Sequence, residues 1–320
     1  MRSRGEVPCG VRGSAPGRSG RQPGMKEEKH MKFHGSYVAL VTPFNEDGSI
    51  DFGKLKELTQ WHLDNGTDGI VALGTTGESS TMSHEEDDAV VRCVLETVNG
   101  KIPVIAGAGS NSTQTQLEKS RKYCELGADG LLLISPYYNK ANDEGMYRHF
   151  ATVADTVDMP IILYNVPGRT GCSISPSVVA RLAKHPNVAG IKEASGNISY
   201  TAKIAKLLSD DFCMFSGNDD MIVPVMSLGG CGVISVFANI CPRECHDIVA
   251  AFAAGEVAKA REMQLKYLDL INALFCEVNP IPVKEAMNQM GMNVGGYRLP
   301  LCEISESGRE TVRRALEVLR

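Results

Sequence analysis

Three stretches of the chain repeat one pattern: NGTDGIVALG at 65–74, LGADGLLLIS at 126–135 and LGGCGVISVF at 228–237. Each has a glycine that ends a helix, a short turn, a second glycine and then an apolar run typical of a buried strand. A unit of this kind recurs eight times, every 20–33 residues. Eight consecutive units predict an α/β protein of the (β/α)8 TIM barrel type.

The predicted strands are short apolar runs rich in β-branched residues. None alternates strongly between apolar and polar residues, as expected of parallel strands that are covered on both faces. A doubly wound sheet is the alternative, but GAGSNS (107–112) lacks the third glycine of the dinucleotide fingerprint. The predicted runs are 36–44, 69–78, 103–110, 130–138, 160–168, 188–195, 212–219 and 232–239.

Composition changes at both ends of the chain. Residues 1–32 are rich in Arg, Gly, Pro and Ser without hydrophobic periodicity, so we predict a disordered tail there. An organelle transit peptide is the alternative for this tail, which lacks the apolar segment of a secretory signal. The catalytic barrel is expected over 33–255 and a C-terminal helical extension over 256–320. The helical stretches of this extension are 256–275, 282–291 and 308–319.

The bulk properties exclude several classes of protein. A net charge of −5 argues against nucleic acid or an anionic membrane as the main partner. No stretch reaches the roughly 18 apolar residues that span a bilayer. The ten cysteines are scattered singly, which predicts free thiols and a cytoplasmic protein. CPREC (241–245) with His246 lacks a second pair of zinc ligands, so we expect no metal.

The run VAGIKEASGN (188–197) is unusual because an apolar strand ends on Lys192. Burying an ammonium is costly unless it is paired or neutral. In one interpretation Lys192 leaves the barrel mouth and pairs with Glu193. In the other it is a nucleophilic amine that forms a Schiff base with a ketone, and the iminium then acts as an electron sink. Strand alternation predicts that Glu193 points away from the interior.

Other polar residues also follow strands, where barrel enzymes place catalytic groups. Tyr164 is the fifth residue of PIILY as Lys192 is the fifth of VAGIK, so a phenol that can shuttle protons should lie level with the amine. A core tyrosine is the alternative. GTTGES (74–79) offers free backbone amides and two hydroxyls that suit a carboxylate, or it is merely a turn. Arg169 can bind a second carboxylate or lie on the surface. Together they describe a class I aldolase acting on a 2-oxo acid.

At these residues the chain resembles the dihydrodipicolinate synthase family, also called the 4-hydroxy-tetrahydrodipicolinate synthase family. The resemblance extends from about Phe33 to the C-terminus. Several motifs in the same order are not expected by chance. They are VALVTPF, GTTGES, SPYYN, LYNVPGRTG, GIKEASGN, GGCGVISV and NPIPVK.

The resemblance implies an imine mechanism. Lys192 would form the imine with pyruvate, and Tyr164 would be the acid and base beside it. Thr75 would link Tyr164 to Tyr138 in a proton relay. In the family this last tyrosine comes from the neighbouring subunit of a tight dimer, so assembly would be part of the mechanism.

The resemblance also implies the substrates and the assembly. Thr76, with backbone near Ile234, would hold the pyruvate carboxylate, and Arg169 would bind the carboxylate of L-aspartate 4-semialdehyde. The aldol product would then cyclise and release the enzyme, in the diaminopimelate route to lysine. The family needs no metal and no organic cofactor, and it is usually a homotetramer built as a dimer of dimers.

Two other functions stay open at this stage. N-acetylneuraminate lyase and the keto-deoxy-sugar acid lyases share the lysine, the tyrosine and the glycine-threonine loop. Arg169 and Tyr138 favour the synthase, because the sugar-acid lyases generally lack an arginine at this place. A non-catalytic barrel used for binding or regulation is the third hypothesis.

One departure from the family pattern concerns regulation. Members that lysine inhibits bind it at the dimer interface, and His84, Asn111 and Tyr137 match positions of that site. Thr115, however, stands where lysine-sensitive members carry a glutamate, and Asp87 where some carry a histidine. Loss of the carboxylate that would face the ligand's amine predicts weak or absent lysine inhibition.

Overall fold

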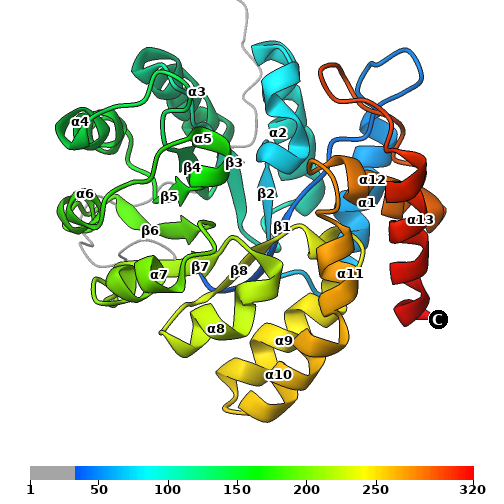
Figure 1. Ribbon diagram of the computed structural model, residues 1–320. Coiled ribbons are helices and arrows are strands. Elements are labelled where there is room, and N and C mark those ends of the chain that lie inside the picture. The colour runs from blue at the N-terminus through cyan, green and yellow to red at the C-terminus, as the bar shows by residue number, and fades with distance from the viewer. Residues whose placement is uncertain (1–32) are drawn as a thin grey trace, which may run out of the picture.

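The computed structural model describes residues 33–320, and the eight predicted strands form a closed parallel barrel in chain order (Figure 1). Strand β8 closes the barrel by pairing with β1. The (β/α)8 barrel is therefore confirmed and the doubly wound sheet excluded, while the tail predicted at 1–32 lies outside the described residues. The strands are β1 (Gly35–Ala39), β2 (Gly69–Ala72), β3 (Val104–Gly107), β4 (Gly130–Ile134), β5 (Ile161–Asn165), β6 (Val188–Glu193), β7 (Cys213–Ser216) and β8 (Gly232–Ser235).

Helices connect the strands and surround the barrel (Figure 1). Several begin with a polar side chain that accepts a hydrogen bond from a backbone amide in the first turn, as Asp51, Ser83 and Ser112 do. The helices are α1 (Phe52–Asp64), α2 (His84–Val98), α3 (Thr113–Leu126), α4 (Asp143–Ala154), α5 (Pro167–Thr170), α6 (Pro176–Leu182), α7 (Ile198–Ala205), α8 (Ile222–Ser227) and α9 (Pro242–Ala253).

The C-terminal region is helical as predicted, with α10 (Val257–Lys266), α11 (Leu268–Ala273), α12 (Ile281–Gln289) and α13 (Glu306–Ala315). The helical stretch 256–275 is divided at Tyr267, whose ring packs on Phe237 with 5.6 Å between the ring centroids. In Figure 1, α11, α12 and α13 lie along one side of the barrel. These helices share one hydrophobic core with the barrel helices, so a domain boundary at residue 255 stays a prediction.

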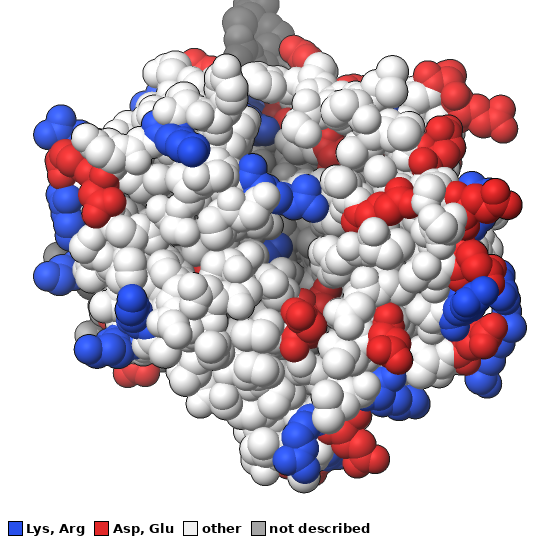
Figure 2. Space-filling view, viewed as in Figure 1, with Lys and Arg blue, Asp and Glu red and all other residues white. Residues whose placement is uncertain are grey.

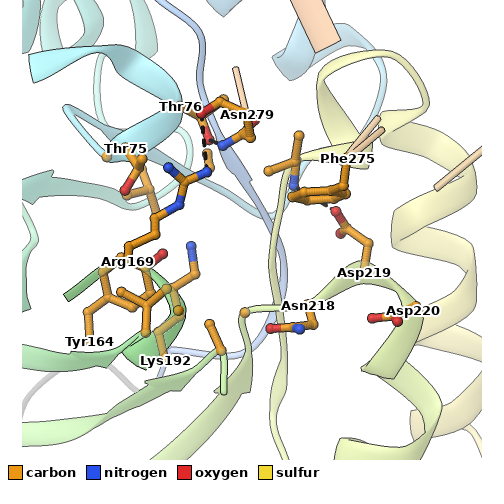
Figure 3. A pocket seen from close by; sticks show the side chains of 18 of the residues that line it. Thr75, Thr76, Tyr164, Arg169, Lys192, Asn218, Asp219, Asp220, Phe275 and Asn279 are labelled. Carbon is orange, nitrogen blue, oxygen red and sulfur yellow. Dashed lines mark hydrogen bonds between the residues drawn. The ribbon is translucent and has the colours of Figure 1, made fainter. Parts of the chain in front are cut away.

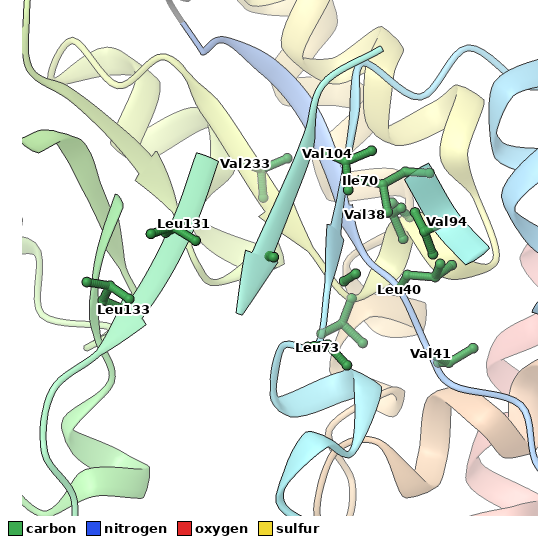
Figure 4. Packing of buried hydrophobic residues seen from close by; sticks show 14 of the residues in the cluster. Val38, Leu40, Val41, Ile70, Leu73, Val94, Val104, Leu131, Leu133 and Val233 are labelled. Atoms are coloured by element: carbon green, nitrogen blue, oxygen red, sulfur yellow. The ribbon is translucent and has the colours of Figure 1, made fainter. Parts of the chain in front are cut away.

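Apolar side chains form two layers, because successive residues of a strand point to opposite faces. Outward-facing residues such as Val38 and Leu131 pack against the helices (Figure 4). Inward-facing residues fill the barrel, where the rings of Tyr37 and Phe215 meet edge to face at 5.3 Å. Gly69 makes room for this layer, since a Cβ there would lie 2.1 Å from the ring of Tyr37.

The strands are shorter than the predicted runs. They differ by at most one residue at their N-terminal ends and by more at their C-terminal ends. The predicted run 69–78 forms a strand only as far as Ala72, because Leu73 has φ +60° and a 3-10 turn occupies Thr75–Gly77. The polar residues that follow the strands therefore lie in loops at one face of the barrel. Throughout residues 33–320 the cysteines are free, as predicted, and no helix is long and apolar enough to cross a membrane.

Candidate active site

Lys192 and Tyr164 lie side by side at the C-terminal ends of β6 and β5. Their Cα atoms are register partners, so the predicted level match is confirmed. The Lys192 Nζ lies 4.6 Å from the centroid of the Tyr164 ring. The side chain of Lys192 is 5% exposed, and it points into the same space as Arg169 (Figure 3). The structure thus brings an amine and a phenol together in a nearly buried position.

Glu193 lies on the other face of β6, as strand alternation predicts. Its carboxylate accepts hydrogen bonds from Asn165 Nδ2 at 2.7 Å and from the backbone amide of Ser195 at 2.8 Å. Burial raises the pKa of Glu193, and the bonds from Ser195 and Asn165 oppose this shift. Glu193 therefore ties β6 to β5 behind the catalytic face, which removes the simple explanation that it pairs with Lys192.

Lys192 and Tyr164 line a pocket of about 530 Å³ at the C-terminal ends of the strands. Five of the predicted site residues meet there, namely Lys192, Tyr164, Thr75, Thr76 and Arg169. In Figure 2 a hollow lies at the centre of the molecular face, with Lys and Arg side chains inside it and at its edge. The pocket therefore combines an amine, a phenol, two hydroxyls and a guanidinium.

Gly217, at the end of β7, leaves room for the lysine. A Cβ at this position would lie 3.0 Å from Cε of Lys192 and 2.6 Å from Cβ of Ala194. The sequence shows this glycine only as part of SGND, with no sign of the contact. A side chain here would push the Lys192 amine from its place beside Tyr164.

The GTTGES segment forms a tight turn with fewer free amides than the sequence predicts. The amide of Gly77 donates to the carbonyl of Gly74 at 3.0 Å, and that of Glu78 donates to the carbonyl of Thr75 at 3.2 Å. The Thr42 hydroxyl donates to the Gly77 carbonyl at 2.6 Å. These two amides are therefore internally bonded, and the polar groups that the turn presents to the pocket come from Thr75 and Thr76.

Asn279 joins two of the predicted residues and was missed by the sequence reasoning. Its Nδ2 donates to the Thr76 hydroxyl at 3.0 Å, and its carbonyl accepts from Nη2 of Arg169 at 3.1 Å (Figure 3). Its Oδ1 is buried without a partner among the described residues. The available signal was its place at the start of NPIPVK, a motif of the family resemblance to which no site role was given. That region therefore contributes directly to the site.

Asp219 is a second residue that the sequence did not single out. It lines the pocket after β7, and its carboxylate accepts from the backbone amides of Val236 and Phe237, both at 3.0 Å. Burial raises the pKa of Asp219, with hydrogen bonds and the charge of Lys192 opposing. The carboxylate therefore holds the loop after β8 against the pocket wall.

Two predicted residues lie elsewhere in this chain. Ile234 is fully buried inside the barrel on β8 and is outside the set of residues that line the pocket. Tyr138 is 91% exposed with φ +68°, and its side chain does not line the pocket of its own chain. The chain by itself does not bring Tyr138 to Thr75, so the relay stays a prediction.

A second pocket of about 290 Å³ adjoins the first, and Thr75 and Tyr164 line both. Among the residues of the predicted regulatory site, His84, Tyr137 and Thr115 line the second pocket, whereas Asn111 does not. Within residues 33–320 no group of three or more His, Cys, Asp or Glu side chains is placed to hold a metal ion.

Asp87 and Lys119 form an ion pair in the wall of this second pocket. The Lys119 Nζ lies 2.8 Å from Asp87 Oδ2, and the Asp87 side chain is 1% exposed. Burial raises the pKa of Asp87, while the charge of Lys119 and its hydrogen bond lower it. The ammonium of Lys119 therefore neutralises the carboxylate through Oδ2, while Oδ1 is buried without a partner among the described residues.

The site as a whole has the composition of an imine-forming, class I aldolase. An amine and a phenol lie level in a barrel pocket, with hydroxyls and an arginine across from them. Barrel enzymes place their catalytic groups at this face.

The comparisons agree with this class. The chain belongs to the dihydrodipicolinate synthetase family, whose model matches residues 32–319. It is 55% identical to the 4-hydroxy-tetrahydrodipicolinate synthase of Caldicellulosiruptor bescii over 284 residues, 89% of this chain and 96% of that protein.

Two crystal structures are similar to the whole barrel. The chloride-inhibited dihydrodipicolinate synthase of Acinetobacter baumannii, complexed with pyruvate, is 44% identical with a TM-score of 0.87, over 89% of this chain and 98% of that one. The enzyme from Cyanidioschyzon merolae with lysine bound is 41% identical with a TM-score of 0.87, over 91% and 99%.

Proposed function

We propose that the chain is a 4-hydroxy-tetrahydrodipicolinate synthase, which condenses pyruvate with L-aspartate 4-semialdehyde and cyclises the product. The observation that carries the proposal is the Lys192–Tyr164 pair in a pocket that also holds Arg169. Relatives of that name at up to 55% identity support it. The free cysteines support a cytoplasmic location.

The chemistry begins with an imine. The neutral amine of Lys192 attacks C2 of pyruvate, and the carbinolamine loses water to give an iminium. Tyr164 supplies the proton that the departing hydroxyl takes and recovers one afterwards. Loss of a proton from C3 then gives an enamine, whose carbon attacks the aldehyde carbon. The aldehyde oxygen takes up a proton, and the iminium at C2 forms again. The product's amine finally attacks C2 and displaces Lys192, which leaves the enzyme unchanged.

The two carboxylates are bound at separate places. Thr76 and the neighbouring turn hold the carboxylate of pyruvate, and Arg169 holds that of the semialdehyde. Arg169 has five N–H donors, and one of its nitrogens, Nη2, donates to the carbonyl of Asn279. This bond steadies the guanidinium while other donors face the pocket.

Replacing Arg169 tests the second carboxylate site. We expect Arg169→Ala to raise the KM for aspartate semialdehyde about 10- to 100-fold, because a charge-assisted hydrogen bond contributes about 1.5–3 kcal/mol. The KM for pyruvate should stay near that of the wild type. Arg148→Ala, on the exposed face of α4, is the matched control. Equal increases in both KM values would contradict the assignment.

The experiment that tests the proposed function compares substrates at matched pyruvate. Turnover of aspartate semialdehyde should exceed that of N-acetylneuraminate and keto-deoxy-sugar acids, with Lys192→Ala as the inactive control. Faster turnover of a sugar acid would contradict the synthase function and favour that of a related lyase. Absence of turnover with all of these substrates would favour the hypothesis that the chain is a non-catalytic barrel.

We also propose a homotetramer built as a dimer of dimers. Tyr138 supports a dimer, because a side chain that is 91% exposed in one chain is free to reach the pocket of a second copy. It would complete the relay through Thr75 to Tyr164. Analytical ultracentrifugation measures the assembly, and an active monomer would contradict this part of the proposal.

The second pocket predicts resistance to lysine. Among the described residues that line it, Asp87 alone carries a carboxylate, and Lys119 already binds it at 2.8 Å. Lys119 already neutralises the charge that would attract a ligand ammonium, so low-millimolar lysine should leave the initial rate unchanged. Thr115→Glu restores a carboxylate and should introduce inhibition. Loss of wild-type activity in low-millimolar lysine would overturn this prediction.

A further inference from the structure

The glutamate of GTTGES and the lysine of NPIPVK form a buried ion pair that the mechanism does not use. Lys284 Nζ lies 2.9 Å from Glu78 Oε1, and both side chains are 0% exposed. The same ammonium donates to the carbonyl of Thr42 at 3.1 Å and to that of Gly296. All three donors of the ammonium are therefore satisfied, and the pair joins segments 206 residues apart.

The surroundings of Lys284 are apolar on two sides. Its Nζ lies 4.5 Å from the ring centroid of Phe44 and 5.2 Å from that of Tyr297. Burial lowers the pKa of Lys284, and the charge of Glu78 opposes the shift. A buried ion pair is often no more stabilising than apolar residues of the same volume. Overall stability therefore does not explain why two charges are placed here.

The position of Glu78 points to the turn beside it. Glu78 directly follows the Thr75–Gly77 turn and has φ +56°, a left-handed conformation that is uncommon for residues other than glycine. Its amide donates to the carbonyl of Thr75. Holding the Glu78 side chain therefore also holds the end of the turn.

Helix α12 contacts this turn at two points. Lys284 binds Glu78 at the back of the turn, outside the pocket lining, while Asn279, just before the helix, donates to the Thr76 hydroxyl inside the pocket. Arg298 adds a weaker contact, from its amide to Glu78 Oε2 at 3.4 Å. The turn is thus held between the barrel and the C-terminal region.

We propose that Glu78 and Lys284 are positioning residues, whose ion pair holds the Thr75–Gly77 turn against α12 and so sets the geometry of the pyruvate-carboxylate site. The inference rests on the proposed role of Thr76 in binding that carboxylate. It gives the C-terminal region a part in substrate binding through residues that do not touch the substrate.

Three variants test the pair: Glu78→Gln, Lys284→Met and the double variant. Each single change leaves one buried charge without its partner, so the melting temperature should fall and the KM for pyruvate should rise at least tenfold, with a smaller change in kcat. The double variant removes both charges and should regain the melting temperature while the KM stays raised. Lys259→Met, which breaks an exposed pair with Glu256, should change neither quantity.

A double variant with the wild-type KM for pyruvate would overturn the proposal, because the pair would then act through stability alone. The double variant also decides the matter if a single variant fails to fold. Thr76→Ala separates the inference from its premise. If Thr76→Ala keeps the wild-type KM for pyruvate, the carboxylate role fails and the positioning role fails with it. If only Thr76→Ala raises the KM, the positioning role alone is refuted.

Discussion

Lys192→Ala is expected to abolish turnover of pyruvate and aspartate semialdehyde, with a loss in kcat of about 10,000-fold or more. In the proposed mechanism the Lys192 nitrogen bonds to the substrate, and no other lysine lines the described pocket. The variant should fold, because the Lys192 side chain lines the pocket and is not part of the hydrophobic core. Steady-state assays with both substrates, beside a thermal melt, measure the two effects.

The matched control is Lys203→Ala, an exposed lysine on α7. It should retain wild-type kcat, which separates the loss of this amine from the loss of any positive charge. A folded Lys192→Ala variant with more than about one hundredth of wild-type kcat would contradict the covalent role, since nucleophile removal elsewhere costs far more.

Tyr164→Phe is the second large effect that we expect. The change keeps the ring that lies 4.6 Å from Lys192 Nζ and removes only the hydroxyl. Loss of a general acid and base lowers rates about 100- to 10,000-fold, and kcat should fall within that range. The KM for pyruvate should change much less, because in the proposed mechanism the phenol acts on the reacting atoms. Stopped-flow measurement of imine formation identifies the slowed step.

Tyr200→Phe is the control for this prediction. Its hydroxyl donates to the carbonyl of Ile174 at 2.6 Å, away from the pocket lining. Removing it should lower stability by about 1 kcal/mol, the usual contribution of one hydrogen bond, and leave kcat unchanged. Similar kcat losses for both tyrosine variants would mean that the loss follows from removing any buried hydroxyl, and would contradict a specific acid–base role for Tyr164.

The repeated pattern of helix-ending glycine, turn and apolar run was sufficient to predict the barrel. The positions of Tyr164 and Lys192 in their runs were sufficient to predict that these two residues lie level. Tyr164 and Lys192 were matched from sequence by their equal positions in PIILY and VAGIK. The match holds because the strands pair in step from Ile162 and Gly190 onward, after a register shift at Ile161. Alternation also placed Glu193 on the outer face of its strand. The strand ends were predicted too late because apolar residues such as Leu73 continue into the turns.

The missing parts of the site depend on contacts between distant segments. Asn279 meets Thr76 across 203 residues of sequence, and no periodicity carries such information. In the sequence, Lys284 is indistinguishable from any other lysine of a predicted helix. Only the structure shows that it pairs with Glu78. The proposed role of Tyr138 requires a second copy of the chain. A motif can mark these residues as a set, but only the folded chain tells which of them touch.

The central claim is that Lys192 forms an imine with pyruvate, and the mass of a trapped peptide tests it most directly. The protein is incubated with pyruvate, reduced with borohydride, digested and analysed by mass spectrometry. We predict a stable adduct, with the mass of reduced pyruvate, on the peptide that contains Lys192, and none in Lys192→Ala. An adduct on another lysine, or no adduct in an active enzyme, would contradict the account.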